Sequence, residues 1–307
     1  MNEGIGFWGL PLAMLGGMIR VSTPYLFVSL GETLTEKSGR INLGLEGTLL
    51  MGAVSGYGVS YLSGSPYLGV LAAGGCGVLL GMLHAWLCSR PRVNDIAVGI
   101  AIMLFGMGLS FYLGKPLIQP EAPQLTALEL GAFSDVPAVR DALRVNPLFL
   151  IGIALAFALR FGLQNTRWGL VLRTVGESAD TARALGYSVD RVRMLATMAG
   201  GFLSGIGGSF LSLYYPGVWN EGLSSGQGLI AVALVIFARW NPIYCLYASL
   251  LYGAAGALGP ALQSLGIQVS PHLLGALPAA LTLGIMIVTC SKDRKLAGAP
   301  AELGVGS

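Results

Sequence analysis

Long apolar stretches recur along the whole chain, and they restrict what it can fold into more than any other feature. A hydrocarbon core of about 30 Å is crossed by roughly 20 apolar residues in a helix. On that basis the 307 residues predict nine spans, at 9–31, 41–62, 67–89, 94–113, 147–164, 194–215, 226–240, 243–263 and 272–290. Because residues 4–34 are too long for one untilted helix and Arg20 would lie inside it, eight or ten spans stay open. The sequence therefore predicts an all-α, polytopic membrane helical bundle that forms a single domain over residues 1–307.

The scarcity of charge agrees with a membrane protein. Only 11% of the residues are charged, against about 25% in an ordinary soluble domain. Forty-six glycines suit close packing of helices within lipid. The basic residues lie between apolar stretches and the net charge is +3, so we expect membrane lipid and no nucleic acid as a partner. Neither the cysteines nor the histidines have the spacing of a metal site, and packing is their expected role: Cys76, Cys88, Cys245, Cys290, His84 and His272.

The positions of Lys and Arg predict the orientation, because short cytoplasmic loops carry them in excess. With nine spans, the basic residues between spans fall on one side, which places the N-terminus outside and the tail 291–307 in the cytoplasm. Segments 114–146 and 215–228 are then outside, and the first is long enough that we expect it to be structured or functional. The basic residues are Arg90, Arg92, Arg167, Arg173, Arg183, Arg191, Arg193, Arg239, Lys292, Arg294 and Lys295.

A short echo links the two halves of the chain. "NLGLEGTLL" starts at Asn42 and "NEGLSSGQG" starts at Asn220, and each leads into an apolar span. The predicted topology puts the first at the cytoplasmic face and the second at the outer face, which is the arrangement of an inverted repeat. Broken helices at corresponding positions of such repeats often border a transport site. Chance recurrence in a chain rich in Gly and Leu is the alternative.

The most polar stretch of the chain is segment 165–193, between the fifth and sixth predicted spans. Residues from Glu177 to Leu185 favour a short helix, Gly176 precedes it, and Gly186 can end it in a left-handed conformation. Small residues on its surface would let the groove of a partner approach closely. The alternative is a solvated loop that only satisfies the positive-inside rule.

Three motifs resemble a known family, the integral membrane permeases of bacterial ABC importers, in the branch of branched-chain amino acid, simple sugar and nucleoside systems. "TEKSGRINLGLEGTLLMGA" (35–53) is similar to the family signature "sE-ksG-iNiGlEG-mlmGA", and "VGESADTARALGYSVDRVR" (175–193) to its cytoplasmic loop "vGeN-aA-alGi-v-r". "GQGLIAVALVIFARWNPI" (226–243) resembles "g-GfiAlAavifGrwnP". The resemblance covers residues 20–290 and is greatest to nucleoside-type permeases.

This resemblance implies a permease subunit of the bacterial cytoplasmic (inner) membrane that works by alternating access. It would pair with a second permease, identical or different, with cytoplasmic ABC ATPase subunits, and with an extracellular or periplasmic substrate-binding protein. The chain itself has no G-x-x-x-x-G-K-[ST] loop. It is therefore expected to bind no cofactor and to be no enzyme, with ATP and Mg²⁺ used by the partner ATPase. Segment 165–193 would hold the coupling helix, and the residues expected to contact the ATPase are Gly176, Glu177, Ala179, Ala182, Ala184, Leu185 and Gly186.

The expected solute is a small polar molecule, best a nucleoside or a similar heterocycle. Met103 stands where nucleoside permeases of this family commonly have an asparagine, so one polar contact is missing. A simple sugar, riboflavin or a small amide therefore stays open.

Candidates for contact with the solute are Asn42, Glu46, Asn94, Phe105, Trp219, Asn220 and Gln227. Glu46 lies about one turn into its span, where an ionisable side chain is a functional hypothesis by default, although it could instead reach the interface or cap the helix near Arg40. Asn42 could cap the same span or face a cavity.

The other candidates also have structural alternatives. Asn94, with Asp95, is expected first as a helix-start residue. Phe105, like Tyr57, is expected first to pack or to face lipid. Trp219, Asn220 and Gln227 would form an outer mouth with an aromatic face and amide groups, and an interfacial tryptophan anchor is the alternative.

Two other functional classes fit the sequence less well. A secondary transporter driven by an ion gradient would need ionisable residues deep in its spans, and the mid-span positions here are nearly free of them. A membrane enzyme would need a catalytic cluster, and the sequence offers none.

Overall fold

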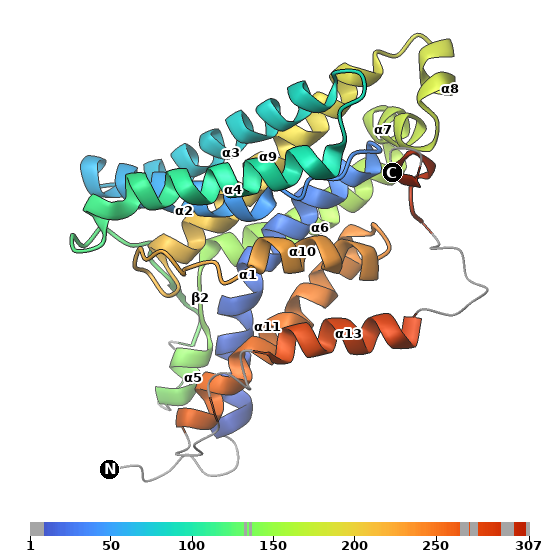
Figure 1. Cartoon of the computed structure of the whole chain (residues 1–307). Helices are drawn as coiled ribbons and strands as arrows, with labels where there is room; N and C mark the ends of the chain where they lie inside the picture. The colour runs from blue at the N-terminus through green and yellow to red at the C-terminus, as the bar shows by residue number, and fades with distance from the viewer. Residues whose placement is uncertain are drawn as a thin grey trace.

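The chain folds into a bundle of helices (Figure 1). The computed structural model describes residues 9–131, 134, 137–264, 270, 276–289 and 298–304. The longer helices are α1 (Gly9–Lys37), α2 (Leu45–Ser63), α3 (Pro66–Cys88), α4 (Asp95–Gly114), α6 (Pro147–Asn165), α9 (Val189–Leu213) and α11 (Pro242–Ser264). The shorter elements are η1 (Lys115–Leu117), β1 (Leu128–Glu129), α5 (Pro137–Ala142), β2 (Arg144–Val145), α7 (Arg167–Glu177), α8 (Ala179–Ala184), α10 (Gln227–Phe237), α13 (Leu277–Thr289) and η2 (Ala301–Gly304).

A helix lies over each of the nine predicted spans, although the bounds differ at several ends. Within the described ranges, six helical segments are long and apolar enough to cross a membrane, so the prediction of an all-α multi-pass membrane bundle is confirmed. They are Pro11–Lys37, Pro66–Cys88, Asp95–Leu117, Pro147–Asn165, Val189–Leu213 and Pro242–Gln263. The count of nine stays a prediction. His272, Cys290 and the basic residues of the predicted tail lie outside the described residues.

Helix α9 is the centre of the bundle, and glycine lets three helices reach its backbone. It packs on α1, α2 and α3. A Cβ atom added to Gly52 of α2 would lie 2.5 Å from the carbonyl oxygen of Gly205, and one on Gly77 of α3 would lie 2.0 Å from that of Gly201. Such contacts are possible only where small residues let backbones touch. The glycine content expected to suit a membrane bundle is therefore used at these crossings.

The bundle presents apolar side chains outward along α4 and α6. Leu104 and Tyr112 of α4 and Phe157 and Phe161 of α6 are among the exposed large hydrophobic residues. Exposed apolar side chains along a spanning helix fit a lipid-facing surface, and this accounts for them.

The prediction that segment 114–146 is structured is confirmed for its described residues, 114–131, 134 and 137–146. Its strands β1 and β2 pair antiparallel, with Leu128 opposite Val145. The hydroxyl of Tyr57 donates to the carbonyl of Pro120 at 2.8 Å, and that of Ser60 donates to the carbonyl of Pro123 at 2.7 Å. These bonds hold the segment against the end of α2.

Candidate functional site

The carboxylate of Glu46 joins two helices that are far apart in the sequence. One oxygen accepts hydrogen bonds from the Ser224 hydroxyl at 2.5 Å and from the Gly226 backbone N–H at 3.0 Å. The other accepts from the Gly228 N–H at 2.6 Å. The first N–H groups of a helix have no partner within it, and Gly226, the N-cap residue of α10, supplies no side-chain bond. Glu46 of α2 therefore caps α10 from outside.

Glycine makes this approach possible. A Cβ atom on Gly228 would lie 2.6 Å from the backbone nitrogen and Cα of Glu46. Gly226 has φ of +81°, in the left-handed region that favours glycine. The chain around 226–228 can therefore lie directly against the first turn of α2.

Neighbouring contacts show how deep Glu46 lies. A Cβ atom on Gly47 would be 2.8 Å from the carbonyl oxygen of Ile102 and 2.7 Å from that of Met103. These residues are close to the middle of α4, which runs from Asp95 to Gly114. Glu46 is buried, 4% exposed, and level with the middle of a spanning helix. Glu46 is in the first turn of α2, as expected, but this turn lies beside the middle of α4 instead of its end.

The same contacts bring the two segments of the internal echo together. The segment that follows Asn220 reaches Glu46 through Ser224, Gly226 and Gly228. The two echo segments therefore meet at Glu46 inside the bundle, although they begin near opposite ends of α4. Arg40, just before Asn42, pairs with Asp95, and Trp219, just before Asn220, packs against Gly114. Their placement at opposite faces of the membrane stays a prediction. The sequence could not indicate the meeting at Glu46, because these bonds join residues 178 to 182 positions apart.

Asn42 shapes the turn before α2. Its backbone N–H donates to a carboxyl oxygen of Glu32 at 2.8 Å, and its side-chain oxygen accepts from the N–H of Gly44 at 2.9 Å. Gly44 is the N-cap residue of α2 and makes no side-chain cap bond. Asn42 is thus a buried turn residue, and its expected role as a helix cap is wrong.

Two acidic residues that sequence reasoning missed lie on α1 beside this turn. Glu32 and Glu36 are 0% and 2% exposed. Glu36 accepts a hydrogen bond from the indole N–H of Trp240. One oxygen of Glu32 has no hydrogen-bond partner among the described residues.

The sequence contains only a weak indication that Glu32 and Glu36 act together. Positions four apart lie on one face of a helix, and acidic residues are rare in this chain. The predicted first span ended at residue 31, so Glu32 and Glu36 were placed outside the membrane. Both lie among the last six residues of α1, so the expectation that mid-span positions are nearly free of ionisable residues stays a prediction. We call Glu32, Glu36, Asn42, Glu46, Ser224, Gly226, Gly228 and Trp240 the junction.

Most of the other candidate residues lie away from the junction. Asn94 caps α4, since its side-chain oxygen accepts from two backbone N–H groups of the first turn, so its helix-start role is confirmed. Phe105 is 55% exposed on the outer side of α4. Gln227 is next to Gly226 and Gly228, and its side-chain oxygen has no partner in the described part of the chain.

Trp219 and Asn220 differ in exposure. Trp219 is 2% exposed, and a Cβ atom on Gly114 would lie 2.1 Å from its indole nitrogen. It packs against the end of α4, so it is neither an exposed mouth residue nor an interfacial anchor. Asn220 is exposed, and its side chain accepts from the N–H of Gly222 at 3.1 Å. The structure thus brings Asn42, Glu46 and Gln227 together and leaves the other candidates apart.

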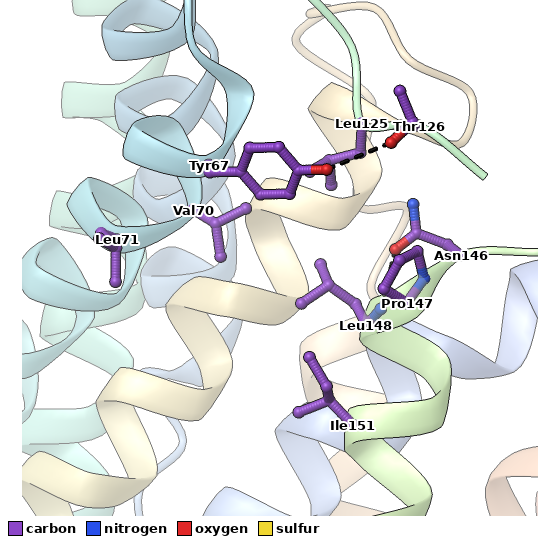
Figure 2. Close-up of a pocket in the computed structure, with 9 residues that line it drawn as sticks. All are labelled: Tyr67, Val70, Leu71, Leu125, Thr126, Asn146, Pro147, Leu148 and Ile151. Carbon is purple, nitrogen blue, oxygen red and sulfur yellow. Dashed lines mark hydrogen bonds between the residues drawn. The ribbon is translucent and has the colours of Figure 1, made fainter. Parts of the chain in front are cut away.

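A separate cavity of about 290 Å³ lies between α3 and α6 (Figure 2). At one end the hydroxyl groups of Tyr67 and Thr126 are 3.2 Å apart, and the buried side-chain nitrogen of Asn146 has no partner among described residues. The remaining walls are apolar, which suits hydrocarbon better than a polar solute. The lining residues are Tyr67, Val70, Leu71, Leu125, Thr126, Asn146, Pro147, Leu148 and Ile151, none of them a predicted binding residue.

Segment 165–193 forms two helices instead of the single short helix expected. Helix α7 continues through Gly176 to Glu177, and α8 begins at Ala179. The chain breaks at Ser178, whose hydroxyl accepts from the N–H of Thr181 and so caps α8. Gly186 has φ of +85°, which confirms the expected left-handed end.

The residues expected to contact an ATPase divide into a buried and an exposed set. Ala179 and Ala182 pack with Val175 and Val189 in a small cluster, and Gly176 is buried against the backbone of Lys37, so a partner cannot contact these three residues. Glu177, Ala184, Leu185 and Gly186 are exposed. Leu185 is 62% exposed, and Tyr187 beside it is also exposed. The outer side of α8 thus ends in an exposed apolar surface.

In the part of the chain that the structure describes, no group of three or more His, Cys, Asp or Glu side chains could hold a metal ion. The junction is built instead from carboxyl groups, backbone N–H groups and one indole. Such a site can hold helix ends together or release them.

Comparison with known proteins gives a consistent picture. The family described as "Branched-chain amino acid transport system / permease component" matches residues 14–289. The chain is 33% identical over 264 residues to TsgC13 of Haloferax volcanii, whose name assigns it provisionally as a glucose ABC transporter permease protein; the match covers 84% of this chain and 80% of that one.

Two further relatives have names that refer to nucleosides. The chain is 29% identical to the nucleoside ABC transporter permease protein NupC of Lactococcus lactis, over 88% of this chain and 92% of that one. It is 30% identical to the guanosine ABC transporter permease protein NupQ of Bacillus subtilis, over 77% of this chain and 78% of that one.

Proposed function

Since the chain belongs to the family of permease components of branched-chain amino acid transport systems, we propose that it is the membrane-spanning permease subunit of an ATP-driven importer for a nucleoside or a simple sugar. The family match over residues 14–289 carries this proposal, because it extends over nearly the whole bundle. Relatives named for nucleosides and for glucose support the two solute classes.

A nucleoside remains the first choice of solute, with a related heterocycle next. The nucleoside permease NupC is matched over 92% of its length. Met103 stands where nucleoside permeases of this family commonly have an asparagine, so a simple sugar, for which the name of TsgC13 gives support, is the second choice. Riboflavin and a small amide are further candidates, to be tested in the same uptake experiment.

The importer would be assembled from several chains. Two permeases, cytoplasmic ABC ATPases that use ATP and Mg²⁺, and an external substrate-binding protein would act together in the bacterial inner membrane. The outer side of α8, with Leu185 and Tyr187 exposed, suits the groove of an ATPase. As the coupling helix, α8 would pass nucleotide-driven closure of the ATPases to the bundle, which alternates between two states.

The finer architecture belongs to this proposal. Nine membrane segments in two inverted halves would place the N-terminus outside and α8 with the C-terminal tail inside. Helix α10 has 11 residues, and at 1.5 Å per residue it spans only about 17 Å. It would therefore begin near mid-membrane, where Glu46 caps it. Two interrupted segments that meet at such a depth are typical of transport sites in repeat-built transporters.

An ion-coupled transporter is the second candidate, and the buried carboxyl groups of Glu32, Glu36 and Glu46 favour it. Deep acidic residues serve as proton or ion relays in such proteins. However, all three accept hydrogen bonds from backbone or indole N–H groups, which is a structural use.

One uptake experiment separates these functions. Cells that lack the chain are complemented with it, and uptake of labelled guanosine and glucose is measured with an inactive partner ATPase or with an uncoupler. We expect uptake to require the active ATPase and to survive collapse of the proton gradient. Uptake that survives loss of the ATPase but stops with the uncoupler contradicts the proposal. Competition by unlabelled nucleosides, sugars, riboflavin and amides then identifies the solute.

A further inference from the structure

The C-terminal segment 298–304 lies against the end of the bundle that carries α7 and α8 (Figure 1, dark red). We call these residues the clasp. The amine of Lys37, at the end of α1, donates to the carbonyl of Gly298 at 2.8 Å. Ala299 and Leu303 pack against the hydrophobic core, and Pro300 is buried. The clasp is thus inserted between helices instead of lying on their surface.

Glu302 in the clasp binds two helices at once. One carboxylate oxygen accepts from the backbone N–H of Ala179 at 2.8 Å. The other accepts from the guanidinium of Arg193 at 3.0 Å. The two side chains of this ion pair are 21% and 12% exposed, so water screens it less than a surface pair. Glu302 therefore connects the first residue of α8 to α9.

Arg193 extends the connection to α1. Its Nε donates to the carbonyl of Ser38 at 3.1 Å. Gly39 leaves the space for the pair, since a Cβ atom there would lie 2.8 Å from Cβ of Glu302. The Glu302 carboxylate therefore binds α8 and α9 directly, and Arg193 extends this link to the end of α1.

Helix α8 depends on such an external bond. It has six residues, far fewer than the roughly 12 to 15 at which an isolated helix becomes even marginally stable in water. Its own cap, Ser178, satisfies the N–H of Thr181. Glu302 satisfies that of Ala179 and at the same time fixes where the helix lies relative to α9.

We propose that Glu302 is a positioning residue for energy coupling: its carboxylate holds α8 to Arg193 and thereby to the end of α1, so that a displacement of α8 moves the bundle. This inference rests on the proposed role of α8 as the coupling helix. Without the bond, α8 would stay on the bundle through Ala179 and Ala182, which pack with Val189 at the start of α9, but its first residue would lose the link through Arg193 to the end of α1.

The test uses the complete complex, with its ATPases and binding protein, in lipid nanodiscs and proteoliposomes. The variants are Glu302→Gln and Glu302→Ala, with Ala301→Ser, an exposed neighbour, as the matched control. We expect the Ala179 amide to exchange its hydrogen about tenfold faster in Glu302→Ala, because its charged acceptor is lost. We also expect more ATP to be hydrolysed per solute imported, by about fivefold or more, a ratio that a loss of folded protein alone does not change.

Glu302→Gln keeps an oxygen that can accept from Ala179 but loses the charge that faces Arg193. An intermediate ratio is expected, and the variant provides the measurement if Glu302→Ala does not assemble. The inference is overturned if the Glu302 variants that assemble show the wild-type rate of hydrogen exchange at Ala179 and the wild-type ratio of ATP hydrolysed to solute imported.

A further variant separates this inference from the proposed function. Leu185→Asp places a charge on the exposed side of α8, away from the clasp. If Leu185→Asp transports normally, the coupling role of α8 is wrong. If it blocks transport while the Glu302 variants behave like wild type, only the role of the clasp is wrong.

Discussion

At the scale of single residues, Glu46 is the side chain on which the junction most depends. Replacing it by glutamine puts an amide NH₂ where one of its oxygens now accepts from Ser224 and Gly226 or from Gly228. A buried donor then faces a donor, and we expect a loss of about 2 kcal/mol in the free energy of unfolding. Thermal unfolding in detergent and uptake in cells measure the effect.

The control is Glu221→Gln, an exposed acidic residue in the turn that leads to α10. It should unfold and transport like the wild type. Equal stability of Glu46→Gln and Glu221→Gln would show that the carboxylate does not hold α10.

Two glycines make a second comparison at this scale. Gly228→Ala forces a methyl group to within 2.6 Å of the Glu46 backbone, whereas a Cβ atom on Gly108 of α4 meets nothing within 4 Å. Overpacking of this kind is expected to cost about 1–3 kcal/mol, and Gly108→Ala should change stability by no more than about 1 kcal/mol. The melting temperatures of the two purified variants measure this difference. Equal melting temperatures of Gly228→Ala and Gly108→Ala would contradict the close contact between Gly228 and Glu46.

The residues that could be predicted from sequence are those whose partners are local. Asn94 binds N–H groups two and three positions ahead, so its capping role follows from its neighbours. Glu46 and Glu36 bind groups about 180 to 200 positions away, and no local pattern contains those partners. The neighbours of Trp219 in the sequence suggest an exposed residue at the membrane interface. Its burial against Gly114 is a tertiary contact, which the local sequence does not show.

At the scale of elements, α8 is the testable unit. Ala184→Trp adds bulk on its exposed side and should abolish uptake and solute-stimulated ATP hydrolysis, while insertion into the membrane is unchanged. Ser63→Trp is the control and should transport normally, because Ser63 is the exposed last residue of α2 and the turn between α2 and α3 lies at the other end of the bundle from α8 (Figure 1). Normal uptake in Ala184→Trp argues against α8 as the coupling helix.

Ala182 does not provide the same test. Its side chain is 0% exposed in the cluster with Val175 and Val189. A tryptophan there would displace α8 from α9 and reduce folding. Lost uptake in that variant would therefore say nothing about contact with an ATPase.

Helix positions could be predicted well from apolar periodicity and length, but several helix ends could not. Helix α1 continues past residue 31 because its polar side chains find partners inside the bundle. The break between α7 and α8 at Ser178 depends on a side-chain cap together with the bond from Glu302. Such features depend on tertiary contacts, which hydrophobic patterns do not encode.

At the scale of the whole molecule, the proposed orientation predicts which residues each side of the membrane can reach. Leu185→Cys on α8 should react with an impermeant thiol reagent only from the cytoplasm, and Ser63→Cys only from outside. Both positions are exposed. Labelling of Ser63→Cys from the cytoplasmic side contradicts the proposed orientation. The wild-type protein, without an introduced cysteine, gives the background labelling of the native cysteines.

The bond between Glu36 and Trp240 also has a consequence for the synthesis of the chain. The two residues are 204 positions apart, so at about 5–20 residues per second the ribosome makes the indole about 10–40 s after the carboxyl group. During that interval nascent α1 holds a carboxyl group without its final partner. Lateral release of α1 into the lipid is therefore expected to be delayed or reversible until the end of α10 emerges. The insertion of the first helix would then be completed only after Trp240 has been synthesised.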